Sequence, residues 1–163
     1  MSNLLEGMKA NAVWRIERYR MRKHLKAGQP YDVSEFIGNL LLNEGIDEAE
    51  KLACGIAATA YSNANARLGV GDSSAAEAAT QTGLQAATNK FWKAMDATYP
   101  TVGSQVMTFK ATFGSAEANY AWAEFTVVNA VDDTGKNLNR KVSAQGTKAS
   151  GQTWVLTLTI TLS

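Results

Sequence analysis

The last eleven residues, TWVLTLTITLS (153–163), carry the clearest structural pattern in the sequence. Apolar side chains recur there at every second position, and threonines fill most of the positions between them. A period of two is the period of a β-strand with one apolar and one polar face. Threonine and the β-branched residues favour the same conformation. The pattern therefore predicts a strand whose buried face carries Trp154, Leu156, Leu158, Ile160 and Leu162.

Three further segments upstream of this strand show similar alternation. They are VMTFKATF (106–113), YAWAEFTVVN (120–129) and LNRKVSA (138–144). The tetrapeptide DDTG (132–135) is a turn signal between the last two. These runs predict an antiparallel meander over residues 105–162 that forms most of one sheet, with one buried and one polar face. Trp122 and Trp154 are expected in its core.

Helical spacing replaces alternation in the segment 34–55. Ser34 has the character of an N-cap before EFIGNLLLNEG, and Asp47 could cap a second short helix, EAEKLAC, which Gly55 would close. The segment therefore predicts two short helices.

The segments between residues 56 and 100 have weaker patterns. ATAY (58–61) and ARLGV (66–70) flank the turn-prone SNAN, which predicts a hairpin. A helix is expected in the segment that ends at Gln85. NKFWKAMDATYP (89–100) fits both a helix and a strand, and we favour a helix start followed by extended chain to Pro100.

Residues 1–33 differ in composition from the rest of the chain, and we term them the N-terminal arm. The run RIERYRMRKHLK (15–26) carries six lysines and arginines and one glutamate. Helical and strand spacing both fit it, the helix with the longer apolar stripe. Arginine interleaved with aromatic residues is typical of nucleic-acid contacts and of protein interfaces. The rest of the chain balances this charge, which favours protein docking through Trp14, Arg15, Arg18, Tyr19, Arg20, Arg22 and Lys23.

The bulk composition limits the class of protein. The chain has 163 residues, 45% hydrophobic and 19% charged, with a net charge of +1. This length suits one domain, and such a net charge gives no global attraction to nucleic acid or to an acidic membrane. The longest apolar run is well below the length of about 18 residues that a membrane-spanning helix needs. The overall prediction is an α+β, mainly β chain: an antiparallel β-sandwich over 34–163 with short helices at 34–55, preceded by an extended or helical arm.

The glycine-containing stretch LGVGDSSAAEAATQTGL (68–84) has the outward look of a phosphate loop. It has no lysine where a Walker loop needs one, and Ser74 stands where a dinucleotide loop needs its third glycine. The alternative is a turn, in which Gly69 and Gly71 let a strand twist and a polar residue caps the next segment. We favour the turn, and expect neither a cofactor nor a metal.

Few side chains suit catalysis. His24 is the only histidine and Cys54 the only cysteine, so a triad or a zinc site lacks partners. His24 is expected to be solvated, and Cys54 to be a packing residue of an apolar helix. Glu117 and Glu124 flank the strand YAWAEF and could form a glycosidase pair. A structural pairing of Glu124 with Arg140 or Lys141 is the simpler interpretation, and the chain is expected to be no enzyme.

Beyond these residue-level inferences, the chain resembles tailed-bacteriophage virion proteins, and more loosely the N-terminal domain of phage tail-collar fibres. The resemblance covers most of the chain, with GNLLLNEGI (38–46) as its lead-in. It departs from the collar pattern after Glu124, where Phe125-Thr126-Val127 stands. The matching features are Gly71-Asp72, Gln81-Thr82-Leu84, the strand 105–113, Glu124, the turn 132–135 and the strand 138–145.

The resemblance implies a virion part that binds other virion proteins and copies of itself. We expect a tail, collar or adaptor protein made in the host cytoplasm. Capsid decoration, a tail-associated glycan hydrolase and a nucleic-acid-binding protein are the alternatives. No small-molecule substrate and no membrane contact are expected.

Overall fold

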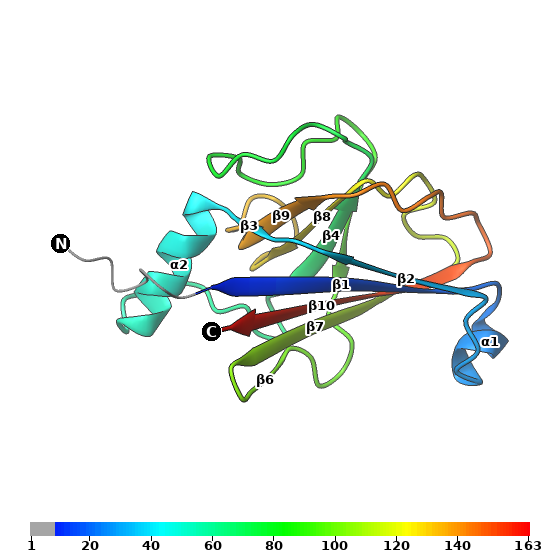
Figure 1. Ribbon diagram of the computed structural model, residues 1–163, viewed down its shortest axis with the longest axis horizontal. Helices are drawn as coiled ribbons and strands as arrows, with labels where there is room; N and C mark the ends of the chain where they lie inside the picture. Colours follow the sequence, from blue (N-terminus) through cyan, green and yellow to red (C-terminus); the bar gives the residue numbers. More distant parts are fainter. Residues whose placement is uncertain (1–8) are drawn as a thin grey trace.

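The structure is a computed structural model, and it describes residues 9–163. Within that range the chain is mostly β, with two antiparallel sheets and two short helices. The sheets face each other and share one hydrophobic core, which gives a β-sandwich-like fold (Figure 1). The expectation of a mainly β, antiparallel fold is therefore confirmed.

The first sheet has the strand order β2-β1-β10-β7-β6. Its members are β1 (Ala10–Tyr19), β2 (Asp32–Ile37), β6 (Thr101–Gly103), β7 (Val106–Phe113) and β10 (Thr153–Leu162). Strand β10 lies at its centre, paired with β1 on one side and β7 on the other. The expected strands 106–113 and 153–162 are both confirmed.

The second sheet has the strand order β3-β9-β8-β4-β5. Its members are β3 (Leu40–Leu41), β4 (Arg67–Gly71), β5 (Lys90–Ala94), β8 (Glu124–Val128) and β9 (Asn139–Val142). The chain thus passes to this sheet after β7 and returns to the first sheet for β10. The prediction that 105–162 forms a meander in one sheet is wrong, because strand pairing across two layers leaves no trace in local alternation.

The core lies between the sheets because each inner face is apolar. Strand β10 contributes four buried apolar residues at alternate positions, the pattern expected from the sequence. Trp122 is fully buried and Trp154 is 2% exposed, so their placement in the core is confirmed. Trp122 meets Trp154 and Phe113 edge to face, with ring centroids 4.8 Å apart in both cases.

The N-terminal arm is not a separate element over the part that the structure describes. Strand β1 is paired on both sides, to β10 and to β2, and its alternate residues are in the core. Strand alternation therefore decides residues 10–19 against the helical interpretation. The reason is the cross-strand register, which places Trp14 opposite Leu158 and Ile16 opposite Leu156.

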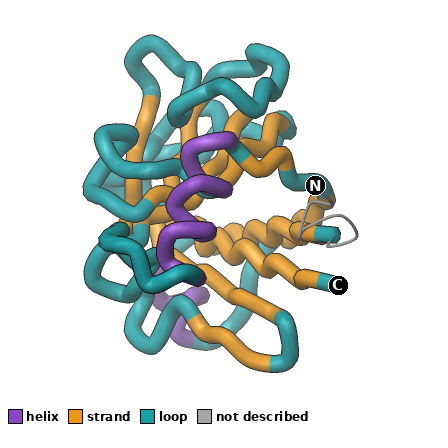
Figure 2. Tube along the Cα trace, turned by 90° about the vertical axis from the view of Figure 1, so that its left-hand side faces the viewer, coloured by secondary structure: helices purple, strands orange, loops and turns teal. Residues whose placement is uncertain are grey.

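Two helices lie at opposite ends of the sandwich (Figures 1 and 2). Helix α1 (Arg22–Lys26) follows β1, and helix α2 (Asn43–Ala53) follows β3. Figure 2 looks toward α2, which crosses in front of the strands. The expected helix over 35–45 is wrong, because residues 32–37 pair with β1 as strand β2. The second expected helix is present but begins earlier, at Asn43.

Three further expectations fail between residues 56 and 100. Residues 58–61 form no strand, and β4 pairs with β5 and β8, so the expected hairpin is absent. No helix forms between residues 72 and 89. The segment 90–94 is strand β5, so the expected helix start there is wrong and the strand alternation of the segment decides its structure.

Candidate functional site

The expected docking residues do not form one surface. Trp14, Arg18 and Tyr19 are between 0% and 5% exposed and belong to the fold. Arg15 is half-buried, and Arg20, Arg22 and Lys23 are exposed. Alternation along β1 directs Trp14 and Arg18 to the core side of the sheet. Tyr19 is on the other face and is buried there, with its hydroxyl group donating to the Glu17 carboxylate at 2.6 Å. The prediction that these seven residues form an interface is therefore wrong for Trp14, Arg18 and Tyr19, because their side chains are buried.

The buried members make contacts that explain their burial. The Trp14 indole stacks on Phe36 at an interplanar angle of 3° and donates a hydrogen bond to the Gly38 carbonyl. The Arg18 guanidinium donates to the Asp32 carboxylate at 2.8 Å and to the Gln145 carbonyl at 2.8 Å. It also lies 4.6 Å from the Trp154 ring centroid. These are structural roles.

The glycine-containing stretch 68–84 contributes strand β4 and the start of a loop over residues 72–89. The loop is fastened to the outer face of the second sheet by Glu124 of β8, whose carboxylate accepts hydrogen bonds from the Gln85 and Ala86 amides, both at 2.8 Å. Arg140 of β9 donates to the Ala75 carbonyl at 3.0 Å. The loop therefore lies against Glu124 on the outer face of β8, all of whose residues are buried. Thr126, on the same face, donates to the Asn137 side-chain oxygen at 2.9 Å and to the Asn139 carbonyl at 2.6 Å.

The glycines of this stretch make room for side chains. A Cβ on Gly71 would overlap the Glu124 carboxylate, and a Cβ on Gly69 would lie 2.8 Å from the Trp92 ring. Strand twist, the role expected for these glycines, does not account for this close approach. The expected helix cap is also wrong, since Ser73 accepts a hydrogen bond from the Ala75 amide within a loop.

Glu124 and Arg140 form a buried ion pair, so the expected structural pairing of Glu124 with Arg140 or Lys141 is confirmed for Arg140, while Lys141 pairs with Glu77. Arg140 Nη2 lies 2.7 Å from Glu124 Oε2, and both side chains are fully buried. The Arg140 Nε atom donates to the same oxygen at 2.9 Å. Both oxygens of this carboxylate therefore accept hydrogen bonds from the protein, and neither is exposed to solvent.

Glu117, the other carboxylate of the glycosidase hypothesis, is also held by an ion pair and hydrogen bonds within the protein. Its oxygens accept hydrogen bonds from Lys93 at 2.6 Å and from the Gly114 amide at 2.7 Å. Burial acts to raise the pKa of Glu117, but these hydrogen bonds outweigh it and the net pKa is lowered. A glycosidase general acid needs a raised pKa, so Glu117 lacks that property.

A buried lysine stabilises the loop beside Glu117. Lys148 is fully buried, and its ammonium group donates to the Gly114 carbonyl and to the Asn119 side-chain oxygen, both at 2.7 Å. Burial lowers the pKa of Lys148 to about 8. No local pattern in the sequence indicates this burial.

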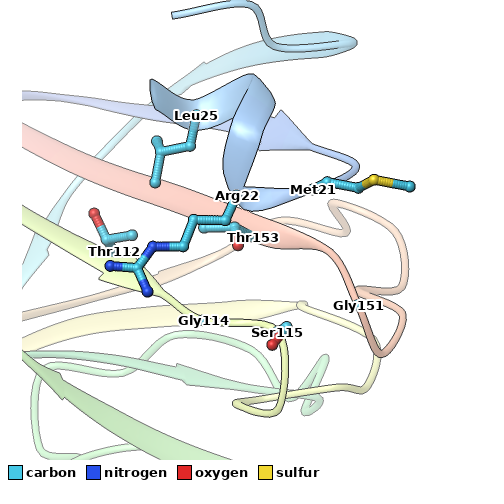
Figure 3. A pocket seen from close by; sticks show the side chains of 8 residues that line it. All are labelled: Met21, Arg22, Leu25, Thr112, Gly114, Ser115, Gly151 and Thr153. Carbon is cyan, nitrogen blue, oxygen red and sulfur yellow. The ribbon is translucent and has the colours of Figure 1, made fainter. Parts of the chain in front are cut away.

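One surface cavity lies beside α1, as Figure 3 shows. It has a volume of about 490 Å³ and is lined by Arg22 and Leu25 of α1 and by residues of β7, β10 and adjoining loops. The Arg22 side chain extends over the strands toward Thr112 (Figure 3). Of the predicted docking residues, Arg22 thus contributes to a concave surface.

A second cavity, of about 450 Å³, contains an acid that the sequence pattern indicated only as part of a turn. Asp133 accepts hydrogen bonds from the Trp92 indole at 3.1 Å and from the Leu84 amide at 3.2 Å. Burial raises the pKa of Asp133 to about 6. The two hydrogen bonds and the positive charge of Lys90, whose Nζ lies 3.9 Å from Asp133 Oδ2, act to lower this pKa but are outweighed. The turn itself is confirmed, with a Gly135 amide bond to the Asp132 carbonyl.

His24 and Cys54, the single histidine and the single cysteine, lie outside the two cavities. His24 is half-buried on α1, and Cys54 is an exposed free thiol at the end of α2, so the expectation that Cys54 packs in an apolar interior is wrong. Over residues 9–163, no three metal-ligating side chains come together. No helix in that range is long and apolar enough to cross a membrane.

No family model, curated protein or solved structure matches this chain.

Proposed function

We propose that this chain is a non-enzymatic structural component of a tailed-phage virion, such as a tail, collar or adaptor protein, that assembles through protein–protein contacts. The resemblance carried by Gly71-Asp72, Gln81-Thr82-Leu84 and the strands around Glu124 motivates the virion role. The structural role is favoured by the contacts of the charged side chains.

The observation that carries the proposal is that the two candidate catalytic carboxylates serve the scaffold. Glu124 joins β8, β9 and the 72–89 loop, and Glu117 joins β5 to the loop after β7. Meanwhile large apolar side chains remain exposed at both edges of the first sheet, with Ile37 on β2 at 75% and Val102 on β6 at 78%. Exposed apolar groups on strand edges are typical of surfaces that other chains cover.

The contacts of the basic run favour protein docking over nucleic-acid binding. Arg18 is used inside the fold, and Arg15 is paired with Glu17 and Glu35 at 3.2 and 2.9 Å. Arg20, Arg22, Lys23 and Lys26 remain as exposed charges in or beside α1. Phosphate-backbone binding needs several free cations along one track, and this group is smaller than the sequence run suggested.

The test is to search for the chain in purified particles by mass spectrometry and to locate it there by gold labelling. We expect several copies per particle, located at the tail or collar. Labelling over the head would instead indicate the decoration role. Absence of the chain from mature particles would overturn the proposal.

A complementation experiment addresses the docking surface. Particles lacking the chain are supplied with the wild type or with the Arg20→Gln, Arg22→Gln, Lys23→Gln triple variant. We expect reduced incorporation of the triple variant. The control is Lys51→Gln, a charge change on α2 at the opposite end of the sandwich, with wild-type incorporation expected.

A further inference from the structure

Strand β2 presents a free edge to solvent. It is the terminal strand of its sheet and pairs only with β1. Its outward side chains are well exposed, with Val33 at 40% and Ile37 at 75%. A free edge of this kind is a template for pairing with another strand unless charge or proline blocks it. The only proline near it, Pro30, lies before the strand.

The hydrogen bonds of β1 define which groups of β2 are free. The Lys9 and Ser163 backbone groups bond each other, so the odd-numbered residues of β1 bond to β10 and the even-numbered ones to β2. The Gly38 amide accordingly donates to the Ala12 carbonyl. Val33, Glu35 and Ile37 therefore direct their backbone N–H and C=O groups away from β1.

We propose that two copies of this chain associate through β2, in an antiparallel pairing centred on Glu35. This pairing places Val33 opposite Ile37 of the second copy, and Ile37 opposite its Val33. The backbone N–H and C=O groups of Val33, Glu35 and Ile37 in both copies then all form hydrogen bonds, about six in total. A shift that places Val33 opposite Glu35 would pair Ile37 with Tyr31, but the Tyr31 amide already donates to the Arg18 carbonyl.

The side chains on the outer face fit this register. Val13 lies beside Ile37 in the β1–β2 pairing and is 37% exposed. Each half of the dimer would therefore join Val13 and Ile37 of one copy to Val33 of the other, in a small apolar cluster. The twofold symmetry makes the same patch serve both copies, as an isologous interface requires.

The centre of the pairing is electrostatically less favourable. Glu35 would face its own copy across the axis, and like charges directly opposite are destabilising. Arg15 lies opposite Glu35 within each chain, with Nη1 2.9 Å from the carboxylate, and offsets part of this repulsion. We expect a weak, reversible dimer, because one strand pair buries less area than a standard interface. Glu35→Gln should strengthen it.

This inference deepens the proposed function by naming a surface for self-association, and its test is independent of virion incorporation. In a Cys54→Ser background, Glu35→Cys places two thiols opposite each other at a Cα separation of about 5.5 Å, within disulfide range. We expect it to cross-link about tenfold faster or more than Val33→Cys, given the high effective concentration within a dimer. Val33→Cys mixed with Ile37→Cys should also cross-link.

Sedimentation of the full chain supplies the second measurement. We expect Ile37→Lys and Glu35→Pro to shift the protein to monomer, while Val131→Lys, at an exposed residue of the turn between β8 and β9, leaves association unchanged. The register of β1 and β2 directs the Glu35 amide away from β1, so proline there should leave the fold intact, as circular dichroism can verify. A wild-type monomer at all concentrations, or equal cross-linking of Glu35→Cys and Val33→Cys, would overturn the pairing. A monomeric chain found in particles would leave the proposed function standing.

Discussion

Arg140 and Glu124 lie on adjacent strands with their charged groups 2.7 Å apart and no side-chain surface exposed to solvent. The same two side chains hold the 72–89 loop, through the Gln85 and Ala86 amides on one side and the Ala75 carbonyl on the other. One buried ion pair thus joins two strands and this loop. The stability of the fold should therefore depend strongly on both side chains.

We expect Glu124→Gln and Arg140→Met each to lower the free energy of unfolding by about 3–5 kcal/mol, because each leaves an uncompensated buried group. The double variant should lose less than the sum of the single losses, since neither charge remains. Urea unfolding followed by tryptophan fluorescence measures all three. Additive losses would show that the two side chains act independently.

Trp14→Ala should lower the free energy of unfolding by about 3–5 kcal/mol, because it leaves a cavity between β1 and the second sheet. Asn11→Ala, on the exposed face of the same strand, should change it by about 0.5 kcal/mol or less. The comparison tests whether β1 is part of the core or a detachable arm. Similar small losses from both variants would favour a detachable arm.

Gly71→Ala should destabilise the fold by about 1–3 kcal/mol, because the added methyl group overlaps the Glu124 carboxylate. Gly103→Ala is the matched control, since a Cβ there meets no atom within 4 Å. Its effect should stay within about 0.5 kcal/mol. Thermal unfolding of the two variants side by side gives the difference. A Gly71→Ala variant as stable as the wild type would contradict the close approach.

The Trp92 indole N–H signal should titrate near pH 6 in NMR spectra, because this group donates to Asp133, whose pKa burial raises to about 6. A raised folded-state pKa means that the protonated acid favours the fold. That contribution is complete below the ordinary value of 3.8 and is lost as pH rises through about 6.

Asp133→Asn should abolish both the titration and this part of the pH dependence of stability. Asp132→Asn, which removes the neighbouring carboxylate that bonds to Thr134, should leave the Trp92 titration in place. A Trp92 signal that titrates unchanged in Asp133→Asn would show that another group is responsible.

Local patterns sufficed where a strand has one buried and one solvated face. Strands β7 and β10 follow their alternation closely, and charge alone predicts that Glu124 pairs with Arg140 or Lys141, of which the structure selects Arg140. The alternation of apolar and polar residues predicted burial wrongly where other segments cover both faces of a strand. Residues 124–128 are all buried. On their outer side Glu124 contacts the 72–89 loop and Thr126 contacts Asn137, and no local period in the sequence indicates either contact.

The sequence by itself determined that the chain is mainly β and antiparallel, that Trp122 and Trp154 are in the core, and that residues 132–135 turn. These properties depend on side-chain alternation and turn chemistry, which act over a few residues. Only the tertiary structure decided that β1 is a central strand, that β7 and β8 belong to different sheets, that Lys148 is buried and that Asp133 is half-buried. Each of those outcomes depends on contacts between residues far apart in the chain, where the free energy of strand pairing and burial outweighs local preference.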